Sequence, residues 1–160
     1  MRVGFGYDIH PLEAGRPLVL GGVAVPHAKG LGGHSDADVL CHAVMDALLG
    51  AAALGDIGEH FPDSDPAYRN ASSIELLKQV VGKVRSAGYA VVNIDATLIL
   101  ESPKLTPYKA AMAGNIAAAV GLGVEAVSVK AKTNERFDSA GRGDAVIAHA
   151  VAFLGERQAS

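Results

Sequence analysis

The chain has 160 residues, of which 49% are apolar and 19% are charged, and its formal net charge is −3. A slightly acidic chain is not expected to coat nucleic acid, although this leaves open a local basic patch. We therefore expect no nucleic-acid partner. The single cysteine, Cys41, excludes a disulfide framework and a structural zinc site built from several cysteines. Typical domains have about 25% charged residues. The surplus of small apolar residues therefore suggests that a partner covers part of the surface.

The first half of the chain shows a hairpin signature and one long apolar helix. Gly21 and Gly22 separate two short apolar runs, and apolar residues then recur at helical spacing after Ser35 and Asp36, which are suitable N-cap residues. In order, we predict a strand over 2–10, hairpin strands over 18–20 and 23–25, a loop over 27–34 and a helix from Ser35 to Leu54.

The second half is predicted to alternate helices and strands. Ser72 to Glu75 matches a capping box, and Thr106-Pro107 places proline at the first turn of a helix. We predict a loop over 55–71, helices from Ser72 to before Gly88 and from Thr106 to Gly121, strands over 89–101, 127–133 and 145–154, and a loop over 134–143. This order predicts one α/β (α+β) domain over residues 1–160, a mixed β-sheet with helices on one face.

No segment is predicted to span a membrane. The most apolar helical stretch, Ala43 to Leu54, contains Asp46 and is too short to cross a bilayer. The N-terminal residues lack the apolar segment of a signal peptide. We therefore expect a cytoplasmic protein without a membrane partner.

A catalytic metal site is suggested by residues on the first strand and the first helix. Asp8 and His10 lie two apart on a strand and share a face. Asp38 and His42 lie four apart on a helix and also share a face. Two histidines and one carboxylate with a free fourth position are typical of catalytic zinc. The spacing leaves open whether Asp8 or Asp38 is the carboxylate ligand, and whether His42 is instead a core histidine.

Two loops carry further polar residues. Asp56, Asp63 and Asp65 could bind the hydroxyls of a sugar or polyol, although turn formation explains them equally well. Lys132 and Arg142 suit phosphate oxygens. Glu135 beside them suits a magnesium ion, and a solvated loop is the alternative for this segment.

His149 interrupts an otherwise apolar strand and shares a face with Ile147 and Val151. It is either a buried histidine with its hydrogen bonds satisfied or a residue at a subunit contact.

Five motifs that occur in order resemble one family. They are Gly4-x-Gly6-Tyr7-Asp8-Ile9-His10, His34-Ser35-Asp36-Ala37-Asp38-x₃-His42, Gly55-Asp56-Ile57-Gly58 with Phe61-Pro62-Asp63-Ser64-Asp65, Ser102-Pro103-Lys104-Leu105, and Lys132-Thr133-x-Glu135 with Gly141-Arg142. Together they look like the 2-C-methyl-D-erythritol 2,4-cyclodiphosphate synthase family of the non-mevalonate isoprenoid pathway. The resemblance covers nearly the whole chain.

The resemblance implies a homotrimer with active sites between subunits. It implies a phosphorus–oxygen lyase that converts 4-diphosphocytidyl-2-C-methyl-D-erythritol 2-phosphate into the cyclic diphosphate and CMP. Zn²⁺ would be held by Asp8, His10 and His42, and Mg²⁺ or Mn²⁺ by Glu135. His34 and Thr133 would be catalytic.

The resemblance also implies a set of substrate-binding residues. The methylerythritol part would lie against the 56–65 loop. The cytidine would lie against two segments of the neighbouring subunit, Leu100 to Thr106 and Ala131 to Thr133. The full set is Asp8, His10, His34, Ser35, Asp56, Ile57, Gly58, Phe61, Pro62, Asp63, Ser64, Asp65, Leu100, Ser102, Pro103, Lys104, Leu105, Thr106, Ala131, Lys132, Thr133, Glu135 and Arg142.

The sequence departs from the family near the expected threefold axis. Asp138-Ser139 stands where relatives commonly have Gly-Phe, and His149 stands where they commonly have Glu. Three copies of His149 would favour an anion, such as an isoprenoid diphosphate, in an axis cavity. Two other functions stay open: a zinc-dependent phosphohydrolase that uses activated water, and a non-catalytic protein that binds nucleotides or isoprenoid diphosphates.

Overall fold

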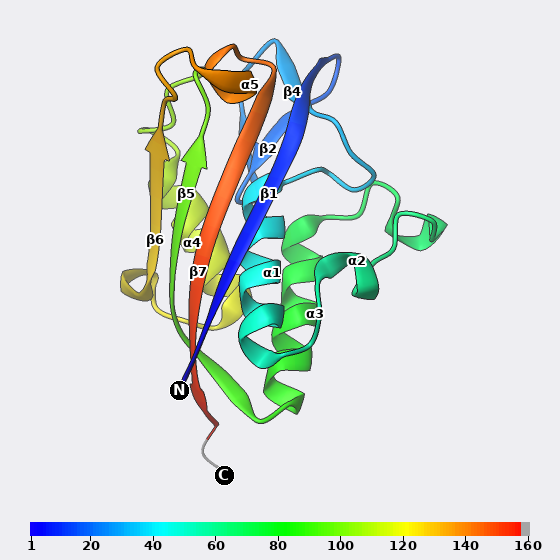
Figure 1. Ribbon diagram of the computed structural model, residues 1–160, viewed down its shortest axis with the longest axis vertical. Coiled ribbons are helices and arrows are strands. Elements are labelled where there is room, and N and C mark those ends of the chain that lie inside the picture. The colour runs from blue at the N-terminus through cyan, green and yellow to red at the C-terminus, as the bar shows by residue number, and fades with distance from the viewer. Residues whose placement is uncertain (158–160) are drawn as a thin grey trace.

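A computed structural model describes residues 1–157 and places a mixed β-sheet at the centre of the fold (Figure 1). The sheet has the strand order β4-β1-β7-β5-β6. Strands β5 and β6 are parallel, and the other neighbouring pairs are antiparallel. The strands are β1 (Arg2–Ala14), β4 (Lys29–Leu31), β5 (Tyr89–Ile99), β6 (Val127–Lys132) and β7 (Ala145–Glu156). The predicted mixed sheet is confirmed.

Three longer helices cover one face of this sheet, as predicted (Figure 1). The central helix, α1, is buried along almost its whole length, because it packs against β1 and β7 on one side and α3 on the other. The longer helices are α1 (Val39–Ala52), α3 (Ser73–Ser86) and α4 (Lys109–Val120), and the short ones are α2 (Ile57–His60), η1 (Pro66–Tyr68), η2 (Val124–Ala126) and α5 (Asp138–Gly141). A separate hairpin, β2 (Leu18–Leu20) and β3 (Val23–Val25), lies outside the main sheet.

Several predicted boundaries were wrong, and local hydrogen bonds explain the largest error. Helix α1 begins at Val39, not at Ser35, because Ala37 has a left-handed φ of 57° that a continuous helix does not allow. The Asp38 carboxylate accepts from the Cys41 backbone N–H and caps the helix.

The capping box predicted at the start of α3 does not form. Ser72 is the N-cap residue, but its side chain makes no capping hydrogen bond, and the Glu75 carboxylate pairs with Lys78 instead. Helix α4 begins at Lys109 rather than at Thr106. Short elements were also missed inside three predicted loops, namely β4, α2 with η1, and α5.

Two glycines let α1 approach β1 very closely. A Cβ atom at Gly4 would overlap the carbonyl oxygen of Ala47, and one at Gly6 would overlap the carbonyl oxygen of Ala43. Only glycine therefore allows the helix backbone to lie against the strand here. Because strand residues two apart share a face, this contact places the end of α1 that carries His42 beside Asp8 and His10.

The opposite face of the sheet is open and partly apolar. Val3 and Phe5 on β1 are 65% and 62% exposed. Tyr7 and Ile9 of the same strand and Val151 of β7 are also exposed. Among residues 1–157, no helix is long and apolar enough to cross a membrane.

Candidate metal centre and substrate cavity

Asp8, His10 and His42 converge on one point between β1 and α1. The Asp8 Oδ2 atom lies 3.0 Å from His10 Nε2 and 3.0 Å from His42 Nδ1. The two imidazole nitrogens are 3.2 Å apart. Three potential ligand atoms thus form a nearly equilateral triangle, in a group that is suited to hold a metal ion.

This triangle fits zinc. With bonds of about 2.0–2.1 Å, the ligand atoms of a tetrahedral zinc ion lie about 3.3 Å apart, close to the separations found here. His10 donates its other ring N–H, on Nδ1, to the carbonyl oxygen of Gly32 at 2.6 Å. That bond leaves the lone pair of Nε2 facing the triangle, which is the tautomer that a metal ligand needs.

The electrostatics of the triangle also favour a bound cation. Burial alone would raise the pKa of Asp8, but its hydrogen bonds with His10 and His42 outweigh burial and lower that pKa. Burial alone would lower the pKa of His10, but the Asp8 carboxylate outweighs it and raises that pKa. An ionised carboxylate therefore faces two imidazoles, an arrangement that stabilises positive charge between them.

Asp38, the competing carboxylate, does not point to this site. Its oxygens accept from the backbone N–H groups of Gly21 at 2.9 Å and Gly22 at 2.7 Å, in addition to that of Cys41. Asp38 is fully buried there. Of the two candidate carboxylates, Asp8 is therefore the one in the triangle. Asp38 instead holds the β2–β3 turn against the start of α1.

A cavity of about 400 Å³ lies next to the triangle. Many residues that the sequence predicted as substrate-binding line it, with four that the prediction missed. The predicted ones are Asp8, His10, His34, Ser35, Ile57, Gly58, Phe61, Pro62 and Asp63, and the missed ones are Gly33, Met45, Tyr68 and Leu76. Met45 lies three residues after His42, so helical spacing could have indicated that it shares the face of α1 toward the cavity.

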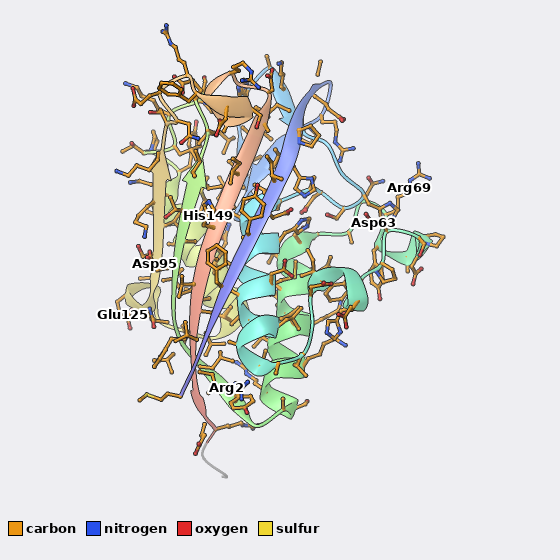
Figure 2. All side chains as sticks on the ribbon, in the orientation of Figure 1. Arg2, Asp63, Arg69, Asp95, Glu125 and His149 are labelled. Atoms are coloured by element: carbon orange, nitrogen blue, oxygen red, sulfur yellow. The ribbon has the colours of Figure 1, made fainter. Side chains whose placement is uncertain are left out.

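The acidic residues of the 56–65 loop have different surroundings. Asp56 accepts from the Glu59 backbone N–H and caps α2, and Asp65 accepts from the Ala67 N–H and caps η1. Asp63, in contrast, lines the cavity. Figure 2 shows Asp63 and Arg69 on the loop beside α2. Of the three aspartates in this loop, two thus stabilise turns, and Asp63 is the one that lines the cavity.

A second, smaller cavity of about 130 Å³ lies at the other side of the chain. The residues that line it are Leu100, Glu101, Pro103, Lys104, Leu105, Thr106, Ala131, Lys132 and Thr133. All of them lie within the two segments, Leu100 to Thr106 and Ala131 to Thr133, that the resemblance places against the cytidine. In Figure 1, β6, which carries Ala131, and α2, which carries Ile57 and Gly58 of the larger cavity, lie on opposite sides of the molecule.

The loop after β6 carries the remaining predicted residues on its surface. Thr133 donates a hydrogen bond to the Glu135 carboxylate at 2.7 Å. Arg142 pairs with Asp144 at 3.3 Å, and both are exposed. Neither Glu135 nor Arg142 lines one of the two cavities described above.

His149 lies on the open face of the sheet, between β7 and β1 (Figure 2). Its ring centroid is 5.8 Å from that of Phe5 and 5.2 Å from that of Tyr7. It is partly exposed, so it is not the fully buried core histidine that one interpretation of the sequence required.

Comparisons with known proteins agree with this geometry. A curated relative from Bordetella petrii, named 2-C-methyl-D-erythritol 2,4-cyclodiphosphate synthase, is 60% identical over 153 residues, which cover 96% of this chain and 94% of that protein. The bifunctional IspDF from Campylobacter jejuni matches with a TM-score of 0.93 and 44% identity. The match covers 97% of this chain and 42% of that longer one.

A solved structure of 2C-methyl-D-erythritol-2,4-cyclodiphosphate synthase in its CDP-bound form matches with a TM-score of 0.88. It is 37% identical, and the match covers 96% of this chain and 100% of that one. The family model described as the YgbB family matches residues 1–155. Because the family model and these relatives span nearly the whole chain, the protein belongs to the YgbB family.

Proposed function

We propose that this protein is a 2-C-methyl-D-erythritol 2,4-cyclodiphosphate synthase. It would convert 4-diphosphocytidyl-2-C-methyl-D-erythritol 2-phosphate into the cyclic diphosphate and CMP. The observation that carries this proposal is the Asp8–His10–His42 triangle beside a cavity, in a chain 60% identical to a relative of that name.

The reaction needs charge stabilisation more than a protein nucleophile. An oxygen of the 2-phosphate attacks the β-phosphorus, a new P–O bond forms, and the bond from the β-phosphorus to the CMP oxygen breaks. Both reacting groups are anionic and repel each other, so positioning and neutralisation lower the barrier. A zinc ion held by Asp8, His10 and His42 would supply Lewis acidity to the phosphate oxygens, and Glu135 would hold Mg²⁺ or Mn²⁺ for the diphosphate.

The side chains around the cavity would orient the substrate. His34, whose Nε2 lies 3.3 Å from the carbonyl oxygen of Asp65, lines the cavity close to the triangle. From there it would donate a hydrogen bond to a phosphate oxygen as charge builds up. Asp63 would accept hydrogen bonds from the hydroxyls of the methylerythritol part. Thr133 and Lys132 would contact the diphosphate and the cytidine part.

We further propose a homotrimer in which the cytidine pocket of one subunit completes the cavity of its neighbour. Two observations support this assembly. The two cavities are lined by elements on opposite sides of one chain, α2 for the larger and β6 for the smaller, although the proposed substrate would contact both (Figure 1). The open face of the sheet exposes large apolar side chains that a second copy would cover, namely Val3, Phe5, Tyr7, Ile9 and Val151.

In such a trimer, His149 would line the axis together with Phe5 and Tyr7, where an isoprenoid diphosphate would contact both apolar side chains and imidazole N–H groups. A cytoplasmic location agrees with the single cysteine, which is a buried free thiol.

Product identification by ³¹P NMR tests the proposed function. The zinc- and magnesium-loaded protein should convert the diphosphocytidyl substrate into one cyclic product with an equal amount of CMP. A linear 2,4-bisphosphate, formed together with CMP when water attacks the diphosphate, would instead identify a hydrolase. Binding of CDP in calorimetry without any turnover would identify a non-catalytic binding protein.

A further inference from the structure

His42, the histidine of the triangle that lies on α1, contacts a buried serine from another helix. Ser73, the first residue of α3, is fully buried. Its hydroxyl oxygen lies 3.0 Å from Nε2 of His42, the ring nitrogen that faces away from the triangle. Ser35 also approaches this nitrogen, at 3.2 Å, and its hydroxyl oxygen accepts from the Ala37 backbone N–H.

A carboxylate determines which way this hydrogen bond points. The Ser73 hydroxyl donates to Oδ1 of Asp36 at 2.5 Å, and an ionised carboxylate only accepts. The one hydroxyl proton of Ser73 is therefore used toward Asp36. Its oxygen can then only accept from His42, which favours a proton on Nε2. Without a metal, the Asp8 carboxylate, 3.0 Å from Nδ1, favours a proton there as well, so the bond to Ser73 selects the tautomer when a metal takes the place of the Nδ1 proton.

This direction places the lone pair of His42 where a metal requires it. With the proton on Nε2, Nδ1 is the unprotonated nitrogen, and it is the atom that lies 3.0 Å from Asp8 Oδ2 in the triangle. His10 reaches the matching state by a different route, through its bond to the Gly32 carbonyl. Each histidine is thus oriented by a partner on the side away from the triangle.

We propose that Ser73 and Asp36 are positioning residues that fix the tautomer of His42 and raise its affinity for the catalytic metal. The chain runs from the Asp36 carboxylate through the Ser73 hydroxyl to Nε2 of His42. This inference rests on the proposed metal site of the enzyme and adds two residues to it that touch neither metal nor substrate.

Asp36 also has a structural role that the test must separate from this one. Its Oδ2 atom accepts from the Ser73 backbone N–H at 3.0 Å, and Oδ1 accepts from that of Asp38 at 3.2 Å. Asp36 thus caps α3 in place of Ser72, and negative charge is favourable at a helix N-terminus. A helix cap alone would affect stability but would leave the tautomer of His42 undetermined.

The first test measures the tautomer directly in the zinc-loaded wild-type protein. Two-bond ¹H–¹⁵N correlation spectra distinguish the two ring nitrogens of His42. The proposal predicts the proton on Nε2. A proton on Nδ1 would overturn it, and this measurement needs no variant and no activity.

The second test measures zinc affinity by competition with a chelator of known strength. Ser73→Ala should weaken zinc binding by about 10- to 100-fold, the usual effect of removing such a partner. Ser72→Ala is the matched control, because Ser72 is exposed and makes no capping hydrogen bond. It should bind zinc as the wild type does, and unchanged affinity in Ser73→Ala would contradict the proposal.

A double-mutant cycle tests whether Asp36 acts through Ser73. Asp36→Asn should weaken zinc binding several-fold in the wild-type background and have no further effect in Ser73→Ala. Equal effects in both backgrounds would show that Asp36 acts independently, against the proposal. If the wild type itself binds no zinc, the proposed metal site fails instead, so the two failures are distinguishable.

Discussion

The two faces of strand β1 carry different kinds of side chains. On the face toward α1, Gly4 and Gly6 have no side chain, and Asp8 and His10 follow as metal-binding groups. On the open face, the residues from Val3 to Ile9 alternate with them and are large, apolar and exposed. One strand thus supplies both the candidate metal site and the candidate assembly surface. The two lie on opposite faces because successive side chains of a strand alternate in direction.

This separation means that substitutions on one face should leave the other unaffected. A change on the inner face should alter zinc binding without altering the oligomeric state. A change on the open face should do the reverse. Substitutions on each face test that expectation.

His42→Ala should have the largest effect, because it removes one corner of the metal triangle. We expect zinc affinity to fall by more than about 100-fold, which exceeds the loss caused by removing a residue that only hydrogen-bonds to a metal ligand. Turnover should disappear. Zinc content by atomic absorption checks this. His60→Ala is the control, since His60 donates to the Leu54 carbonyl outside the triangle; it should keep its zinc.

Phe5→Glu should break the assembly and leave the metal site intact. Phe5 is 62% exposed on the open face, and three buried carboxylates near an axis would repel each other. Light scattering should show a single chain that still binds zinc but has lost turnover. The control is Val124→Glu, 56% exposed on η2. A trimer that survives Phe5→Glu would count against this use of the open face.

Gly6→Ala should push α1 away from β1, because the new Cβ would overlap the Ala43 carbonyl oxygen. Overpacking of this kind costs about 1–3 kcal/mol, and zinc binding should weaken as His42 moves. Urea unfolding measures the first effect. Gly82→Ala, with open space around it in α3, should instead stabilise the protein by about 0.5–1 kcal/mol.

Lys130→Ala should have the smallest effect. Lys130 pairs with Asp95 between the neighbouring strands β6 and β5, and both side chains are nearly half exposed. Such pairs contribute less than about 1 kcal/mol, which urea unfolding can measure. A loss of several kcal/mol would show that the assembly buries this part of the open face as well.

The sequence was most informative where the spacing of residues along a strand or helix determines which face they share. The spacing of Asp8 and His10 predicted one shared face, and the structure brings His42 to it. Sequence spacing did not decide between Asp8 and Asp38, because the hydrogen bonds that bury Asp38 come from a turn sixteen residues or more away.

The fold was predictable at the level of elements and less so at their ends. Helix α1 was extended too far toward Ser35 because the left-handed Ala37 has no signature in the sequence. The cap that Asp36 supplies to α3 depends on a contact between distant segments. Asp38 caps its own helix through Cys41, but the turn bonds that bury it also come from a distant segment. Ser73 was missed as a site residue for the same reason, since its partner His42 lies on a different helix.

Native mass spectrometry of the zinc-reconstituted protein tests both faces of β1 in one measurement. The account predicts a complex of three chains that carries one zinc ion per chain. A single chain, or a complex that retains no zinc, would contradict the assignment of the inner face to the metal and of the open face to assembly.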